Sequence, residues 1–241
     1  MYSFSKPIRV RWIVAVMVLT LTGIGGAWQF ARSLSQPHPE RYAPGVLYGG
    51  IAQQQLLSRP VAREYLSTFH TQETLSSCGP SSVLNVLNSL GIPIANENAL
   101  FDSNAWGWLS VRLQGITLDD LASLVAERHI GEVTVLRDLS YEAFLDHLKR
   151  SNNLDNRYIV NFDRKPIFGV PVGHFSPIGG YDENSDLVAI LDVTPGYGPS
   201  LVPSKLLYDA VQTTDSATGR SRGLIHISNL TGMAGRKDVR R

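Results

Sequence analysis

The chain has 241 residues, of which 43% are hydrophobic and 18% charged, which is enough apolar material for one domain with its own core. Its formal net charge is only +1, and no long basic run is interleaved with aromatic residues, which argues against a nucleic-acid-binding protein. Without the basic N-terminal stretch the remainder is close to neutral, and this suits a small neutral or mildly charged substrate.

The first 28 residues have the order of an export signal, because basic residues precede an uncharged apolar run from Trp12 to Trp28. Small residues at Gly25 and Ala27 permit cleavage of a signal peptide before Trp28. Tryptophans at both ends of the run instead favour an uncleaved signal anchor. A buried core helix fits the flanking charges badly. We therefore expect an exported protein, either anchored in the membrane and facing the periplasm or extracytoplasmic space, or periplasmic after cleavage.

After this segment we expect a Pro/Gly-containing linker at 29–50, the domain proper at 51–229 and a basic disordered tail at 230–241. Within the domain, helical patterns dominate the first half and strand patterns the second, which is the order of an α+β fold. The predicted strands are Glu132–Leu136, Arg157–Phe162, Val172–Tyr181, Leu187–Val193 and Gly223–Ser228.

The predicted helices are marked by their ends. One begins at Cys78, with Pro80 in its first turn, and stops at Gly91. Thr117 with Asp120 resembles a capping box and predicts a second helix. Two more are expected, one from near Ser140 to near Arg150 and a short one at Ser204–Gln212.

Cys78 is the only cysteine, and it stands where backbone N–H groups and the helix dipole favour a thiolate. An exported chain with one cysteine has no internal disulfide, so a free thiol or an intermolecular bridge has to be explained. Gly79 would let a substrate carbonyl approach the backbone, and the N–H of Cys78 can point at a developing oxyanion. On local sequence alone, a buried and inert cysteine stays an equal alternative.

A nucleophilic thiol needs a histidine and a carboxylate that orients the ring. Of six histidines, His174 stands out because its strand is predicted to fold back on the next one. A hairpin centred on residue 183 would place His174 directly opposite Asp192, with Cβ atoms about 4.5–5.5 Å apart. Asp192 also interrupts an apolar run, where an unpaired charge is costly. The alternative is a core histidine with an exposed edge-strand aspartate, and Pro177 predicts an edge strand or a bulge that could shift the register.

Gln72, six residues before Cys78, can donate an amide N–H to the same oxyanion. One cysteine and no His/Cys cluster at ligand spacing argue against a metal site built from protein ligands, and no bound cofactor is expected.

At these residues the sequence resembles the phytochelatin synthase family. The matching pieces come in the family's order across residues 65–228, and the Gly-His-Phe-Ser-Pro-Ile-Gly-Gly-Tyr piece is long and highly specific. They are Phe69–Gln72, Cys78–Gly79, Leu84–Ile92, Gly115–Leu118, Gly173–Tyr181, Ala189–Val193 and Arg222–Gly223.

The resemblance implies a papain-like α+β fold, with an N-terminal helical lobe followed by an antiparallel sheet lobe. It implies that Cys78 takes the γ-glutamylcysteinyl group of glutathione as a thioester and releases glycine, with His174 as base, Asp192 as orienter and Gln72 in the oxyanion hole. The acyl group would pass to a second glutathione, making phytochelatin, or to water. A heavy-metal ion such as cadmium or zinc would arrive as a glutathione thiolate complex. Three further positions are implied in substrate binding: Gly79, Gly173 and Arg222.

The sequence departs from the family where Thr194–Val202 replaces a basic stretch that usually follows the Asp-Val pair. The Cys-rich C-terminal region of the plant proteins is also missing from the sequence. A basic residue in that stretch could hold a glutathione carboxylate, so we expect hydrolysis to rival or exceed transpeptidation. Two alternatives stay open: a papain-like leader peptidase of the double-glycine type, and a non-catalytic membrane-tethered binding module in which Cys78 only packs.

Overall fold

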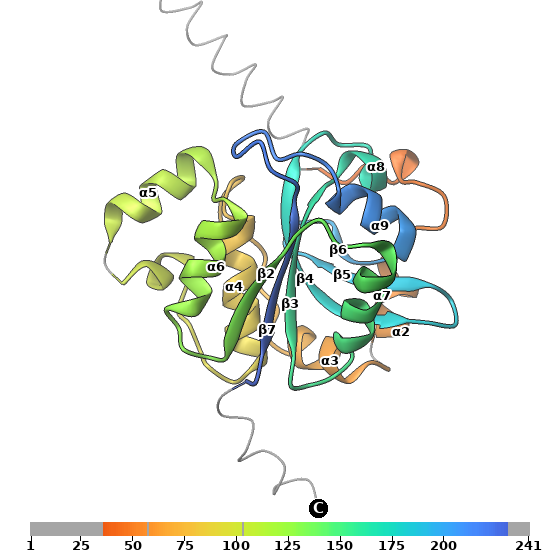
Figure 1. Ribbon diagram of the computed structural model, residues 1–241, viewed down its shortest axis with the longest axis horizontal. Coiled ribbons are helices and arrows are strands. Elements are labelled where there is room, and N and C mark those ends of the chain that lie inside the picture. Colours follow the sequence, from red (N-terminus) through yellow and green to blue (C-terminus); the bar gives the residue numbers. More distant parts are fainter. Residues whose placement is uncertain (1–35, 57, 103, 231–241) are drawn as a thin grey trace, which may run out of the picture. The chain divides into compact units, whose positions relative to one another are not determined.

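The computed structural model describes residues 36–56, 58–102 and 104–230 (Figure 1). The predicted export segment at 1–28 and all but the first residue of the predicted tail lie outside the described residues, so both stay predictions. Within the described part, no helix is long and apolar enough to span a membrane. The compact unit starts at Pro37, and β1 (Leu47–Tyr48) already pairs with a later strand, so the fold begins earlier than residue 51.

The first half of the fold is helical, as predicted. Helix α4 begins at Cys78 and ends next to Gly91, whose φ of +76° turns the chain out of the helix. Thr117 caps α6 by accepting the backbone N–H of Asp120 at 3.2 Å. The elements here are η1 (Pro39–Arg41), α2 (Gly49–Leu56), α3 (Pro60–Leu66), α4 (Cys78–Ser89), η2 (Glu97–Phe101), α5 (Ala105–Gln114) and α6 (Leu118–Ala126).

The second half carries the sheet. All five predicted strands are present to within one residue at either end, and β1 and β6 are additional ones. The elements are β2 (Glu132–Leu136), α7 (Tyr141–Arg150), β3 (Arg157–Asp163), α8 (Lys165–Phe168), β4 (Gly173–Asp182), β5 (Leu187–Asp192), β6 (Gly198–Pro203), α9 (Ser204–Val211) and β7 (Gly223–Ser228). The strands pair antiparallel in the order β1-β6-β5-β4-β3-β7-β2, which confirms the α+β fold with an antiparallel sheet.

Helices cover both faces of this sheet: α4 and α6 lie on one side, and α7 and α9 on the other (Figure 1). Neighbouring strand residues therefore enter different cores. In β3, Ile159 belongs to the core under α4, whereas Tyr158 and Val160 belong to the core under α7 and α9. Burial on both faces holds β4 and β5 rigidly in the middle of the sheet, where His174 and Asp192 are found.

The predicted register of the β4–β5 hairpin is wrong. The observed pairs run from Asp182 with Leu187 to Ile178 with Ile190, and a bulge shifts the register between Ile178 and Gly180. Carried back along β4, this pairing places Thr194, not Asp192, opposite His174. The bulge lies next to Pro177, as the proline predicted, although β4 is an interior strand and not an edge.

Candidate active site

Cys78 is the first residue of α4 and lines an open cleft of about 1040 Å³, which is the size of a pocket for a small ligand. Its neighbour Gly79 is explained by packing. A Cβ added at this position would lie 2.5 Å from Cγ2 of Ile116 and 3.2 Å from Cδ1 of Leu121, so only glycine lets α4 come this close to α6. Gly79 is not among the described residues that line the cleft.

His174 and Asp192 are in contact despite the shifted register. The two residues are buried, and Nε2 of His174 lies 3.0 Å from Oδ1 of Asp192. The backbone N–H of Thr194 donates to the same carboxylate oxygen at 2.8 Å, which holds the acid in place. Because Nε2 is committed to Asp192, the other ring nitrogen, Nδ1, is left for the cysteine.

Cys78, His174 and Asp192 shift one another's pKa values. Burial raises the pKa of the Cys78 thiol, but the charge of His174 and a hydrogen bond with its ring outweigh this and hold the pKa below its usual value. Burial lowers the pKa of His174, but the Asp192 carboxylate outweighs it and the net pKa is raised. Both shifts favour a thiolate beside an imidazolium, which is the reactive form of such a pair.

Gln72 lies beside the same strand end. Its backbone N–H donates to the carbonyl of Val193 at 2.7 Å, which joins the segment before α4 to the residue after Asp192. Its side-chain Nε2 donates to the carbonyl of Thr74 at 2.7 Å, and this uses one of the two N–H groups of the amide. The structure thus brings the segments of Gln72, Cys78, His174 and Asp192 together.

Arg164 is a buried member of the site that the sequence reasoning missed. Its Nη2 lies 3.1 Å from Oδ2 of Asp192, opposite the histidine, and its guanidinium is 3.8 Å from the ring centroid of Tyr197. Burial raises the pKa of the Asp192 carboxyl, but the charges of His174 and Arg164 hold it well below its usual range. Thr194 and Tyr197 belong to the Thr194–Val202 stretch, where the sequence departs from the family pattern. This stretch therefore packs around the Arg164–Asp192 ion pair.

We expect Arg164→Met to destabilise the fold by roughly 3–5 kcal/mol, because it leaves a buried carboxylate with one of its two cations removed. Denaturant unfolding of the folded unit measures this. Lys149→Met is the matched control, since Lys149 pairs with Glu183 where both side chains are half exposed, and it should cost at most about 1 kcal/mol. Equal stability of the two variants would contradict a supporting role for Arg164.

A second polar group of the cleft surrounds Arg222, which is one of its lining residues. Nη1 of Arg222 donates to Oδ1 of Asn161 at 3.0 Å, and its Nε donates to Oγ1 of Thr213 at 3.2 Å. Gly173 lies against this guanidinium, since a Cβ added there would be 2.4 Å from Nη1 of Arg222. Asp215 also lines the cleft. Sequence reasoning singled out Gly173 and Arg222 but not Asn161 or Asp215, which no local pattern marks.

Four of the other described histidines serve contacts elsewhere in the fold. The ring of His226 stacks on Tyr158 with centroids 4.4 Å apart, and His147 meets both rings edge-on. The backbone of His70 is clamped by the side chain of Asn85, and His38 pairs with Glu40. In the described ranges, no group of three or more His, Cys, Asp or Glu residues is placed to hold a metal ion.

A cysteine at a helix N-terminus, beside a histidine–carboxylate pair on an antiparallel sheet, is the arrangement of the papain-like cysteine-nucleophile proteins. A family model described as "Phytochelatin synthase" matches residues 59–224. The chain belongs to the phytochelatin synthase family, which is of this papain-like cysteine-nucleophile type.

The relatives are consistent with this. The chain is 34% identical to "Glutathione gamma-glutamylcysteinyltransferase 3" of Lotus japonicus, in an alignment that covers 68% of this chain and 37% of that protein. It is 33% identical to "Glutathione gamma-glutamylcysteinyltransferase 1" of Triticum aestivum, in an alignment that covers 68% of this chain and 35% of that protein. Over 64% of the chain, it is 26% identical to the Schizosaccharomyces pombe enzyme of that name, of which 40% is covered. The chain thus spans little more than a third of the curated relatives it matches.

Among solved structures, the fold is similar to a double glycine motif protease from an AMS/PCAT transporter, in complex with its leader peptide. The TM-score is 0.44 at 17% identity, over 67% of this chain and 89% of that one.

Proposed function

We propose that this protein is a glutathione γ-glutamylcysteinyltransferase or hydrolase in which Cys78 is the nucleophile, His174 the acid–base group and Asp192 its orienter. The observation that carries the proposal is the His174–Asp192 contact of 3.0 Å beside a cleft-lining cysteine whose pKa is lowered by that histidine. Membership of a family whose relatives are named for this activity supports the substrate.

In the first half of the reaction, the Cys78 thiolate attacks the carbonyl carbon of the Cys–Gly bond of glutathione. The oxyanion that forms is stabilised by the backbone N–H of Cys78 and the free N–H of Gln72. The imidazolium of His174 then gives its proton to the leaving nitrogen, the C–N bond breaks, and glycine departs. A γ-glutamylcysteinyl thioester remains on Cys78.

In the second half, the now neutral His174 accepts a proton from water or from the α-amino group of a second glutathione as that oxygen or nitrogen attacks the thioester carbon and the C–S bond to Cys78 breaks. This step releases the acyl product and restores the thiolate–imidazolium pair. The Thr194–Val202 stretch contains no Lys, Arg or His that could bind a carboxylate of a second glutathione, and its Thr194 and Tyr197 contact Arg164. We therefore expect water to compete strongly as acceptor.

The polar side chains around Arg222 fit the γ-glutamyl end of the donor. That end carries an α-carboxylate and an α-ammonium group, and Arg222 and Asp215 offer the two opposite charges. Asn161 holds the Arg222 guanidinium at 3.0 Å. A cation and an anion that line the same cleft suit a zwitterionic group better than an uncharged peptide.

Gly173→Ala should therefore raise the KM for glutathione by about tenfold while kcat changes little, because the new methyl group displaces the Arg222 guanidinium from its place in the cleft. Steady-state kinetics of glycine release measure this. Gly50→Ala is the control, since Gly50 lies in α2, is not among the described residues that line the cleft, and has no atom within 4 Å of a Cβ added there. A loss confined to kcat would argue against this role of Gly173.

The test of the proposed function is incubation of the purified domain with glutathione, with and without cadmium, followed by mass spectrometry of the products. Free glycine with γ-glutamylcysteine or phytochelatin supports the proposal. A double-glycine leader peptide offered in parallel tests the peptidase alternative. Absence of glycine release under all these conditions would reject the proposal.

A further inference from the structure

The loop at residues 213–222 carries two of the residues that face the donor, and its own hydrogen bonds make it a small closed unit. The N–H of Asp215 donates to the carbonyl of Arg220 at 2.8 Å, and the N–H of Arg222 donates to the carbonyl of Thr213 at 3.0 Å. Asp215, Ser216, Ala217 and Arg222 line the cleft. The position of this loop relative to α4 and α6 therefore decides the shape of the donor site.

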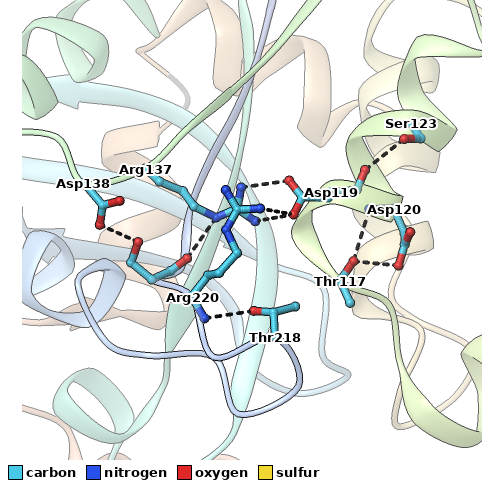
Figure 2. A network of polar contacts seen from close by, with 9 residues as sticks. Thr117, Asp119, Asp120, Ser123, Arg137, Asp138, Thr218 and Arg220 are labelled. Atoms are coloured by element: carbon cyan, nitrogen blue, oxygen red, sulfur yellow. Dashed lines mark hydrogen bonds and ion pairs between the residues drawn. The ribbon is translucent and has the colours of Figure 1, made fainter.

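A single carboxylate on α6, that of Asp119, binds this loop through Arg220 and also binds Arg137 (Figure 2). Oδ1 and Oδ2 of Asp119 accept from the two terminal nitrogens of Arg137 at 2.8 and 3.1 Å. Oδ2 of Asp119 also accepts from Nη1 of Arg220 at 2.9 Å. Arg220 belongs to the loop, and Arg137 follows β2, so one acid joins three parts of the chain.

The same arginine also holds the loop backbone. Nε of Arg137 donates to the carbonyl of Ser221 at 3.0 Å, and the hydroxyl of Ser221 donates to Asp138 at 2.6 Å. Two guanidinium groups thus meet at one carboxylate, and they would repel each other without it. The side chain of Arg137 is only 9% exposed, so it has little room to turn away and Arg220 is the group that would leave.

We propose that Asp119 is a positioning residue of the donor site: by binding Arg137 and Arg220 together, it holds the loop where Asp215 and Arg222 meet the γ-glutamyl group. This inference rests on the proposed function for the identity of the donor. Asp119 itself is not among the described residues lining the cleft, so it acts through the loop and not on the substrate.

The experiment compares wild type, Asp119→Asn, Asp119→Glu and Arg220→Met by hydrogen exchange and by kinetics of glycine release. Asp119→Asn should speed exchange of the loop amides and raise the KM for glutathione roughly tenfold with kcat nearly unchanged. Asp119→Glu keeps the charge and should recover most of the affinity. Arg220→Met should loosen the loop as well, and combining it with Asp119→Asn should add little, because both remove the same link.

Asp182→Asn is the matched control, because it breaks another ion pair of an arginine with a partly exposed aspartate, Arg59–Asp182, that holds no part of the loop. It should leave loop exchange and KM at the wild-type values. Unchanged exchange in Asp119→Asn, or faster exchange with an unchanged KM, would overturn the inference. If wild type released no glycine, the proposed function would fail instead, while hydrogen exchange would still decide whether Asp119 holds the loop.

Discussion

Replacing Cys78 by alanine is expected to abolish glycine release, with a loss of kcat on the order of 10⁴-fold or more. The chain has no other cysteine that could form the thioester. Catalytic groups that act as a unit lose nearly all their effect when the nucleophile is removed. The assay is steady-state release of glycine from glutathione by the purified folded domain.

Cys78→Ser separates loss of the nucleophile from loss of the fold, since it keeps the size of the side chain but has a poorly ionised hydroxyl. It should be as inactive as the alanine variant while unfolding at the same denaturant concentration as wild type. Full glycine release by either variant would reject a covalent mechanism at Cys78.

The second large effect is expected at His174, where alanine should also abolish turnover and should raise the pKa of the Cys78 thiol. The histidine supplies the charge and the hydrogen bond that lower this pKa, and without it burial, which raises the pKa, dominates. Wild type should therefore react with iodoacetamide well below pH 8, whereas His174→Ala should need a higher pH. The rate of alkylation as a function of pH measures the shift.

Asp192→Asn provides a graded comparison. An asparagine can still accept the histidine N–H through its oxygen, so activity should fall but not vanish. Because the carboxylate raises the pKa of His174, its loss should move the alkaline limb of the pH–rate profile to lower pH.

For the His174 prediction, an alkylation profile that is identical in wild type and His174→Ala would show that the imidazole does not activate the Cys78 thiol.

Local pattern predicted several elements of the fold whose apolar residues face a core. Helix α6 has both a cap at Thr117 and a buried apolar face, and β2 and β7 have the predicted bounds. Helix α5 was missed because only Val111 of its ten residues is buried, so it shows no apolar period. Strand β6 was missed because glycine and proline at its ends read as a loop, although Leu201 and Val202 enter opposite cores.

At the site, the sequence led to the His174–Asp192 contact through a wrong register. The turn lies between Asp182 and Leu187, later in the chain than the predicted centre at residue 183, and the bulge beside Pro177 shifts the pairing one residue back toward the prediction. The contact survives because Asp192 lies two residues from the position opposite His174, where a large side chain can still reach it. Arg164 could not be found this way, because its contact with Asp192 depends on the turn after β3. The one available signal was that a buried aspartate between a histidine and an apolar core needs a further cation.

The central claim is that the acyl group of glutathione is held on Cys78 as a thioester. The most direct measurement is mass spectrometry of the intact protein, acid-quenched during turnover, followed by mapping of the modified peptide. We expect an adduct with the mass of glutathione minus glycine, labile to hydroxylamine and located on Cys78. Glycine release without any such adduct in rapid-quench samples, or an adduct on a different residue, would contradict the account.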